Sequence, residues 1–251
     1  YKSRGSSHYI SCDEINSIIR DNSGMMWLGS IGGGVLNADI HQSMFTFHSL
    51  NFADDDIPTT SVRSLFTDSD NNIWMGIGTY GLACLEYATG KLKSHSQMPE
   101  FTGMTIPTVF SVVQRKGSGE IWFGTYDGGI FAYHKGQRVR NLTPENCKFL
   151  GSSCVSALYE DKYANCWVGT RGSLGVQLAD GNSFLFENMS FVDGAQLNWF
   201  YVRDIIADSD NSMWIATSNY GLIHIEGDIR NPSTLKYYNY SFYNKRMLTN
   251  N

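Results

Sequence analysis

One segment of about fifteen residues recurs five times in this 251-residue chain. The copies "DSDNNIWMGIGTYGL" from Asp68 and "DSDNSMWIATSNYGL" from Asp208 are nearly identical, and three others keep the same tryptophan. The five tryptophans are spaced 45 to 48 residues apart and are Trp27, Trp74, Trp122, Trp167 and Trp214. A fixed period of this length indicates a repeat architecture in which each copy is one structural unit.

Each copy predicts four β-strands. It opens with a short β-branched stretch such as "VRSLFTD" from Val62, and this stretch ends in Asp, Asn, Ser and Gly, which favour a tight turn. A second strand carries the tryptophan, a third follows a glycine-rich turn, and a fourth is rich in aromatic residues. Because no helical periodicity occurs, we expect an all-β fold of five antiparallel propeller blades. The repeats span approximately residues 12–57, 58–105, 106–151, 152–198 and 199–245.

The recurring tryptophan and glycines have predicted mechanical roles. Each tryptophan is expected to be the surface on which the next blade packs. Two residues later a glycine lets the neighbouring backbone approach closely, at Gly29, Gly76, Gly124 and Gly169, with Ala216 in the last copy. A further glycine starts the third strand and is expected to need a positive φ or a bulge, at Gly34, Gly81, Gly129 and Gly221, with Gly175 as the displaced equivalent in the fourth copy.

The first strand carries a small residue at one position in four copies, namely Ser17, Ser64, Ser111 and Ala157. The fifth copy has Asp204 there, a charge that packing alone does not explain.

Composition limits the possible partners. The net charge of −5 and the isoelectric point near 5.6 provide no basic surface for nucleic acid or for an anionic membrane. No apolar run approaches the roughly eighteen residues of a membrane span, and the chain opens at Tyr1 without a signal peptide. We therefore expect neither nucleic-acid binding nor direct membrane insertion by this segment.

The five cysteines form no CxxC pair, so the sequence predicts no metal site and no cofactor. Cys147 and Cys154 are close enough in sequence to form a disulfide within one loop. Buried free thiols are the preferred interpretation, because cysteine packs as a small hydrophobic residue.

The pattern V-x-S-L-x-x-D-x-x-G-x-x-W-x-G-T-x-x-G-L resembles the two-component regulator propeller repeat. The segment "VRSLFTDSDNNIWMGIGTYGL" from Val62 is close to it, and all five copies follow it. The third copy departs from it by a longer turn that lacks the aspartate. The resemblance implies that these blades are part of a longer propeller of about seven blades, as propellers have about four to eight.

The same resemblance implies a function. Such propellers form the periplasmic sensors of hybrid two-component systems in Bacteroidetes, where they precede a β-sandwich, a membrane helix and a histidine kinase with a fused response regulator. They detect oligosaccharides released from polysaccharides. The resemblance thus implies an oligosaccharide ligand, a kinase elsewhere in the full-length protein, a homodimeric receptor, and no enzymatic activity in this segment.

Strand topology predicts where a ligand would bind. The turns between second and third strands open on the same face as the linkers between blades, and these segments hold aromatic rings beside Asn, Asp and Arg, which suit a sugar. Trp199 is the strongest candidate because it lies outside the repeated series, and Arg171 could pair with an acidic group. The predicted ligand-binding residues are Tyr80, Tyr126, Asp127, Arg171, Trp199, Tyr201 and Tyr220.

Three alternatives remain open at this point. A sialidase-like glycosidase is disfavoured because its aspartate motif has a different register and because the acidic cluster Asp54–Asp56 has the composition of a solvated loop. A protein-interaction scaffold of the WD type is disfavoured because Leu, Met, Phe, Val or Ile follows the tryptophan. Calcium binding at "DSDNNI" is disfavoured because the glycine and the terminal glutamate of an EF-hand loop are missing.

Overall fold

A computed structural model describes the chain except for residues 1–13, 32–33, 40–43, 49–60 and 241–251. Cys12, the acidic cluster at residues 54–56 and both ends of the chain lie outside the described residues. The chain divides into two compact units. One comprises Tyr1–Val112 with Tyr133–Val139, and the other comprises Val113–Ala132 with Arg140–Asn251.

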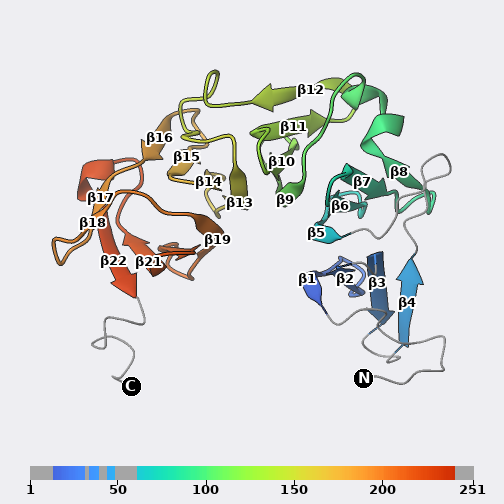
Figure 1. The fold of residues 1–251 in the computed structure, drawn as a ribbon, viewed down its shortest axis with the longest axis horizontal. Helices are drawn as coiled ribbons and strands as arrows, with labels where there is room; N and C mark the ends of the chain where they lie inside the picture. The colour runs from blue at the N-terminus through green and yellow to red at the C-terminus, as the bar shows by residue number, and fades with distance from the viewer. Residues whose placement is uncertain (1–13, 32–33, 40–43, 49–60, 241–251) are drawn as a thin grey trace. The chain divides into compact units, whose positions relative to one another are not determined.

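The fold is all-β and consists of five four-stranded antiparallel sheets, the blades of a β-propeller (Figure 1). In every sheet the strands neighbour one another in chain order, so each blade is a meander. The first blade contains β1 (Ile15–Arg20), β2 (Met26–Ser30), β3 (Gly34–Asp39) and β4 (Met44–His48). The second contains β5 (Val62–Thr67), β6 (Ile73–Ile77), β7 (Gly81–Leu85) and β8 (Leu92–Ser94).

The third blade contains β9 (Val109–Gln114), β10 (Ile121–Thr125), β11 (Ile130–His134) and β12 (Gln137–Leu142). The fourth contains β13 (Val155–Glu160), β14 (Cys166–Thr170), β15 (Leu174–Gln177) and β16 (Ser183–Phe186). The fifth contains β19 (Val202–Ala207), β20 (Met213–Thr217), β21 (Gly221–Glu226) and β22 (Lys236–Tyr240). The five predicted first strands and the tryptophan-bearing second strands are all confirmed.

A few elements lie outside the blades. A two-stranded hairpin of β17 (Met189–Ser190) and β18 (Gln196–Leu197) precedes the fifth blade and was not predicted. The helical segments in the described ranges are three short 3-10 turns, η1 (His95–Gln97), η2 (Pro99–Phe101) and η3 (Pro232–Thr234).

The repeated tryptophans are buried where a following sheet covers them. Trp27 is 8% exposed, Trp74 and Trp122 are 3% exposed and Trp167 is 2% exposed. Trp214 on the fifth blade is only partly buried and stacks on His224, with ring centroids 4.1 Å apart. Four of the five tryptophans are therefore buried, as the repeat predicts. Trp214 is the cross-strand partner of Ile206, which is more exposed.

The glycine two residues after the tryptophan allows close packing of the next sheet. A Cβ atom at Gly76 would lie 2.3 Å from the carbonyl oxygen of Val109, and one at Gly169 would lie 2.3 Å from Cγ1 of Val202. Real Cβ atoms do not approach so closely, so a side chain at either position would push two blades apart.

The turn before the third strand requires a left-handed backbone. Gly34, Gly81, Gly129 and Gly221 have φ between 71° and 80°, as the repeat predicts. The expectation for Gly175 was wrong. The turn of the fourth blade is one residue shorter, since Gly169 pairs with Leu174 whereas Gly76 pairs with Leu82. Gly172 has the positive φ there, at 109°, and Gly175 instead allows the approach of the Phe149 carbonyl.

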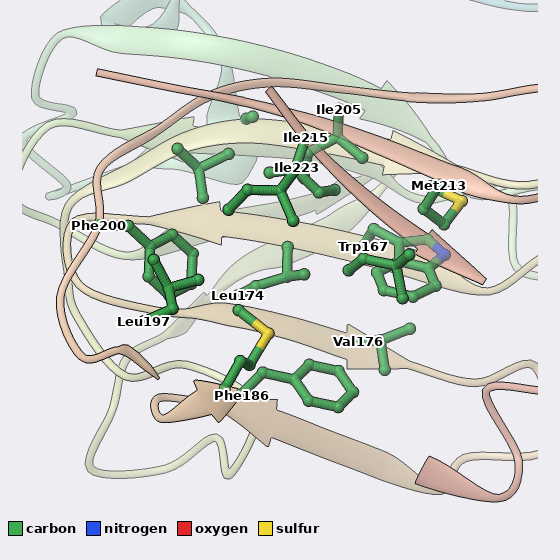
Figure 2. Close-up of a cluster of buried hydrophobic side chains, with 14 of the residues drawn as sticks. Trp167, Leu174, Val176, Phe186, Leu197, Phe200, Ile205, Met213, Ile215 and Ile223 are labelled. Carbon is green, nitrogen blue, oxygen red and sulfur yellow. The ribbon is translucent and has the colours of Figure 1, made fainter. Parts of the chain in front are cut away.

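One of the hydrophobic clusters of the second unit lies between the fourth and fifth blades. Trp167, Leu174 and Val176 of the fourth blade pack in one cluster with Ile205 and Ile215 of the fifth (Figure 2). This cluster also includes Leu197 and Phe200 from the segment that joins the two blades. Burial of so many aliphatic side chains holds these two sheets together.

The described cysteines are free thiols. Cys147 and Cys154 are both buried and form no disulfide, so the preferred interpretation of the sequence is confirmed. Burial raises the pKa of Cys147 to about 11 and that of Cys166 to about 12. Both thiols are therefore protonated and unreactive at neutral pH.

Candidate ligand-binding site

The linker that enters the fifth blade, residues 198–201, is hydrogen bonded to a turn of the fourth blade. The backbone N–H of Gly172 donates to the Phe200 carbonyl at 2.7 Å, and Arg171 forms an antiparallel β-bridge with Tyr201. The N–H of Arg171 in turn donates to the Cys154 carbonyl at 3.1 Å. The linker is thus held to the turn between β14 and β15.

The same linker is also hydrogen bonded to a turn of the fifth blade. The N–H of Ser218 donates to the Tyr201 carbonyl at 2.9 Å. The side chain of Asn219 donates to the Trp199 carbonyl at 3.0 Å and accepts from the N–H of Tyr201 at 3.3 Å. Residues 198–201 are therefore fixed by two blades, and the side chains they carry stand on a rigid support.

Trp199 is half exposed on this support. The residue retains 50% of its accessible surface, and the guanidinium carbon of Arg171 lies 6.0 Å from the ring centroid. The backbone of Gly172 passes beneath the indole, because a Cβ there would lie 3.3 Å from Cδ1 and Nε1 of Trp199. An indole supported on one side and open to solvent can accept the apolar face of a ligand ring.

Tyr201 forms a second aromatic contact with an arginine. The guanidinium carbon of Arg203 lies 4.3 Å from the Tyr201 ring centroid, and Nε of Arg203 donates to Oγ of Ser218 at 2.5 Å. The Tyr201 hydroxyl lies 3.7 Å from Sγ of Cys154. Burial, followed by the contact with Cys154, raises the pKa of the Tyr201 phenol, so this group stays neutral and can both donate and accept.

Not all the predicted residues join this group. Tyr126 and Asp127 are exposed in the turn between β10 and β11, and Tyr126 is close enough to influence the pKa of Tyr201. Tyr220 is half-buried and packs on Phe191, at 6.5 Å between ring centroids. Tyr80 belongs to the other unit, where it is 37% exposed before β7.

Arg203 was missed by sequence reasoning. It is the second residue of β19, and it was treated as part of a strand rather than as part of the ligand-facing loops. Alternation along the strand gave no reliable signal, because β19 is bulged between Val202 and Asp204, and both Arg203 and Asp204 are exposed there.

A separate cavity lies elsewhere in the second unit. It has a volume of about 800 Å³ and is formed by the turns before β14 and β20 together with the segments after β15 and β21, with Tyr163, Asp180, Asp210 and Arg230 among its lining residues. Arg230 is already paired with Asp228 through bonds of 2.9 and 3.0 Å. Sequence reasoning did not predict this cavity, and the ligand-facing residues do not line it.

The aspartates of the repeated turns have structural partners. The Asp68 carboxylate accepts hydrogen bonds from the N–H groups of Asp70 and Asn72 and from the side chains of Asn72 and Trp74. Across the described parts of the chain, no three His, Cys, Asp or Glu side chains come together as a metal site would require. No helix of the described residues has the length and apolar character of a membrane span.

Residues 56–79 match the model of the family described as two component regulator propeller. The resemblance seen in the sequence is thereby confirmed for the second repeat. The other repeats share its tryptophan spacing and its four-stranded sheet.

One curated relative is histidine kinase P4 of Formosa agariphila, which is 25% identical over 174 residues. The match covers 66% of this chain and 12% of the kinase, so the chain spans a small part of that protein's length.

Two solved structures show which proteins share the fold. The extracellular domain of a hybrid two component system of B. thetaiotaomicron superposes with a TM-score of 0.73 at 19% identity, covering 92% of this chain and 29% of that domain. A gluconolactonase of Xanthomonas campestris superposes with a TM-score of 0.57 at 10% identity, covering 81% of this chain and 69% of the enzyme. Identities this low establish a shared fold and no more.

Proposed function

We propose that this chain is part of the extracytoplasmic sensor of a hybrid two-component system and that it recognises an oligosaccharide. Three observations support the sensor role: the regulator propeller match at residues 56–79, the similarity to a histidine kinase, and the fold shared with the extracellular domain of a hybrid system. On this proposal the segment lies in the periplasm, and the kinase lies elsewhere in the full-length protein.

The half-exposed indole of Trp199 on its fixed linker is the observation that carries the ligand proposal. Sugars bind proteins by placing apolar ring faces on aromatic side chains while their hydroxyls form directional hydrogen bonds. Trp199 offers the ring, Arg171 offers a donor beside it, and Tyr201 on the same linker offers a neutral hydroxyl. Because the linker is already fixed, little conformational entropy is lost on binding.

The signal would pass through the assembled receptor. We propose that the full receptor is a homodimer and that the ligand shifts the packing of its propellers, since a ligand shifts an equilibrium only by binding two states differently. Superimposable free and bound dimers of the complete ectodomain would exclude this mechanism.

The ligand proposal is tested by calorimetry of this chain with a panel of neutral and charged oligosaccharides. Replacing Trp199 with Ala should weaken binding about 10- to 100-fold, the range expected for loss of a central aromatic contact. Tyr163→Ala is the matched control, because Tyr163 is an exposed aromatic residue that lines the 800 Å³ cavity of the same unit. Loss of affinity in the Tyr163 variant alone would move the site to that cavity.

The same mixtures should be analysed by chromatography for products. The sensor proposal expects binding without turnover. Hydrolysis of any oligosaccharide that binds would instead support the glycosidase alternative.

A further inference from the structure

Arg171 and Arg203 differ from other arginines of the second unit in their partners. Arg115 pairs with Glu160 at 2.7 Å, Arg140 pairs with Glu120, and Arg230 pairs with Asp228 at 2.9 Å. Among the residues that the structure describes, no carboxylate lies within 4.0 Å of the Arg171 or Arg203 side chain. Both guanidinium groups face aromatic rings instead.

The nearest acidic residue in sequence does not neutralise them. Asp204 follows Arg203 on β19, and its carboxylate accepts a hydrogen bond from the N–H of Ile205 at 2.9 Å. β19 is bulged between Val202 and Asp204, and among the described residues the Arg203 and Asp204 side chains form no ion pair within 4.0 Å. The positive charge beside Tyr201 is therefore not compensated by its neighbour.

The aromatic contacts leave the arginines free to bind an anion. A guanidinium that rests on a ring face keeps its N–H edges directed outward, and these edges match a carboxylate or a sulfate in a bidentate geometry. Of these donors, Nε of Arg203 is engaged by Ser218, which fixes the orientation of the group. The two arginines and the two rings form one surface, because Arg171 and Tyr201 are β-bridge partners.

Resting on the proposed function, we infer that the ligand is an anionic oligosaccharide whose sulfate or carboxylate group is bound by Arg171 and Arg203 while a sugar ring contacts Trp199. A neutral sugar would use the ring and leave two uncompensated charges beside it. An acidic sugar uses both features of the surface.

The first test compares two pairs of oligosaccharides that differ only in charge. The probes are an oligogalacturonate with its neutral methyl ester, and a sulfated galactan oligosaccharide with its desulfated form. At least one anionic member should bind about tenfold or more tightly than its neutral partner, as one charge-assisted hydrogen bond predicts. The double variant Arg171→Gln, Arg203→Gln should lose this preference, whereas Arg138→Gln, an exposed strand arginine of the other unit, should keep it.

The second test needs no ligand. Fluorescence of Trp199, isolated by subtracting the Trp199→Phe variant, should be quenched more strongly by iodide than by caesium at low ionic strength. The double glutamine variant should abolish that difference. Circular dichroism and the melting temperature of each variant establish that it is folded.

The outcomes separate this inference from the sensor proposal. Equal binding of neutral and anionic partners overturns the inference and leaves the sensor proposal standing. Absence of binding by every anionic member, or equal quenching by iodide and caesium, also overturns it, and the neutral panel then decides the sensor proposal.

Discussion

The indole Nε1 of Trp74 donates a hydrogen bond to Oδ2 of Asp68 at 2.8 Å. The same bond joins Trp27 to Asp21 at 2.8 Å and Trp167 to Asp161 at 3.3 Å. The carboxylate that closes the turn therefore also holds the tryptophan. This dual role explains why the two residues are six positions apart in these copies.

Removing the Asp68 carboxylate should destabilise the second blade strongly. Asp68 is 6% exposed and accepts four hydrogen bonds, so Asp68→Ala leaves several buried donors without a partner and should cost about 3 kcal/mol. Asp208→Ala in the fifth blade is the matched control. Asp208 is exposed and accepts from Ser209, and its loss should cost under about 1 kcal/mol. Urea denaturation measures both, and equal effects would contradict the role assigned to Asp68.

A methyl group at Gly76 should separate two blades. The added Cβ would lie 2.3 Å from both Oγ of Ser64 and the Val109 carbonyl, so Gly76→Ala should lower the unfolding free energy by about 2 kcal/mol or more. The reverse change in the fifth blade, Ala216→Gly, should cost at most about 1 kcal/mol, the usual effect of glycine in a strand. Thermal unfolding distinguishes the two, and a Gly76→Ala protein as stable as the parent would refute the packing argument.

The buried ion pair of Arg115 and Glu160 should couple the third and fourth blades. The Arg115 side chain also donates to Gln177 at 2.8 Å and lies 4.5 Å from the Trp122 ring centroid. Glu160→Ala leaves the buried Arg115 charge without its ion-pair partner and should lower the unfolding free energy by about 3 kcal/mol. The double variant Arg115→Met, Glu160→Ala should cost less than the sum of the single changes.

An exposed pair provides the control for that cycle. Arg230 and Asp228 are 77% and 51% exposed, and removing Asp228 should change stability little because solvent screens the pair. If the stability losses of the Arg115 and Glu160 single variants simply added up in the double variant, the two side chains would act independently, and the predicted coupling would be wrong.

Asp21 should make stability depend on acid pH. Burial raises its pKa, but bonds from Ser23, Trp27 and Met25 outweigh burial, and the net pKa lies below the ordinary value of 3.8. The carboxylate therefore contributes stability above about pH 4, and this contribution is lost as the pH falls through the lowered pKa. Asp21→Asn should flatten the fall of unfolding free energy below pH 4. An unchanged slope, measured by urea denaturation at several pH values, would contradict this.

The fold could be predicted because local signals agreed with the repeat. Val62, Val155 and Val202 each begin a first strand in the register that the sequence indicates. The hairpin at Met189–Leu197 lies outside the repeat and was missed, because two-residue strands carry no usable periodicity.

Contacts between repeats were harder to predict than the repeats themselves. Arg115 stands at the turn position that Asp68 occupies in the second blade, since Arg115 bonds to Glu120 as Asp68 bonds to Asn72. The sequence shows a lost aspartate there, and nothing local indicates that its replacement reaches Glu160 of another blade. For the candidate site, strand topology predicted that Arg171, Trp199 and Tyr201 lie on one face, and the structure places them side by side. The position of Tyr220 depends on tertiary packing, which the repeat does not encode.

The double attachment of residues 198–201 has a consequence for evolutionary change in chain length. An extra residue there would shift the Phe200 and Tyr201 carbonyls out of register with Gly172 and Ser218 at once, so both blades would lose a contact. The turn between β17 and β18, only a few residues upstream, is bonded to another strand at its start, where the N–H of Val192 donates to the Tyr237 carbonyl at 3.0 Å, and its following residues 193–195 are exposed. Insertions and deletions among homologues should therefore accumulate in that turn and spare the four residues that carry Trp199.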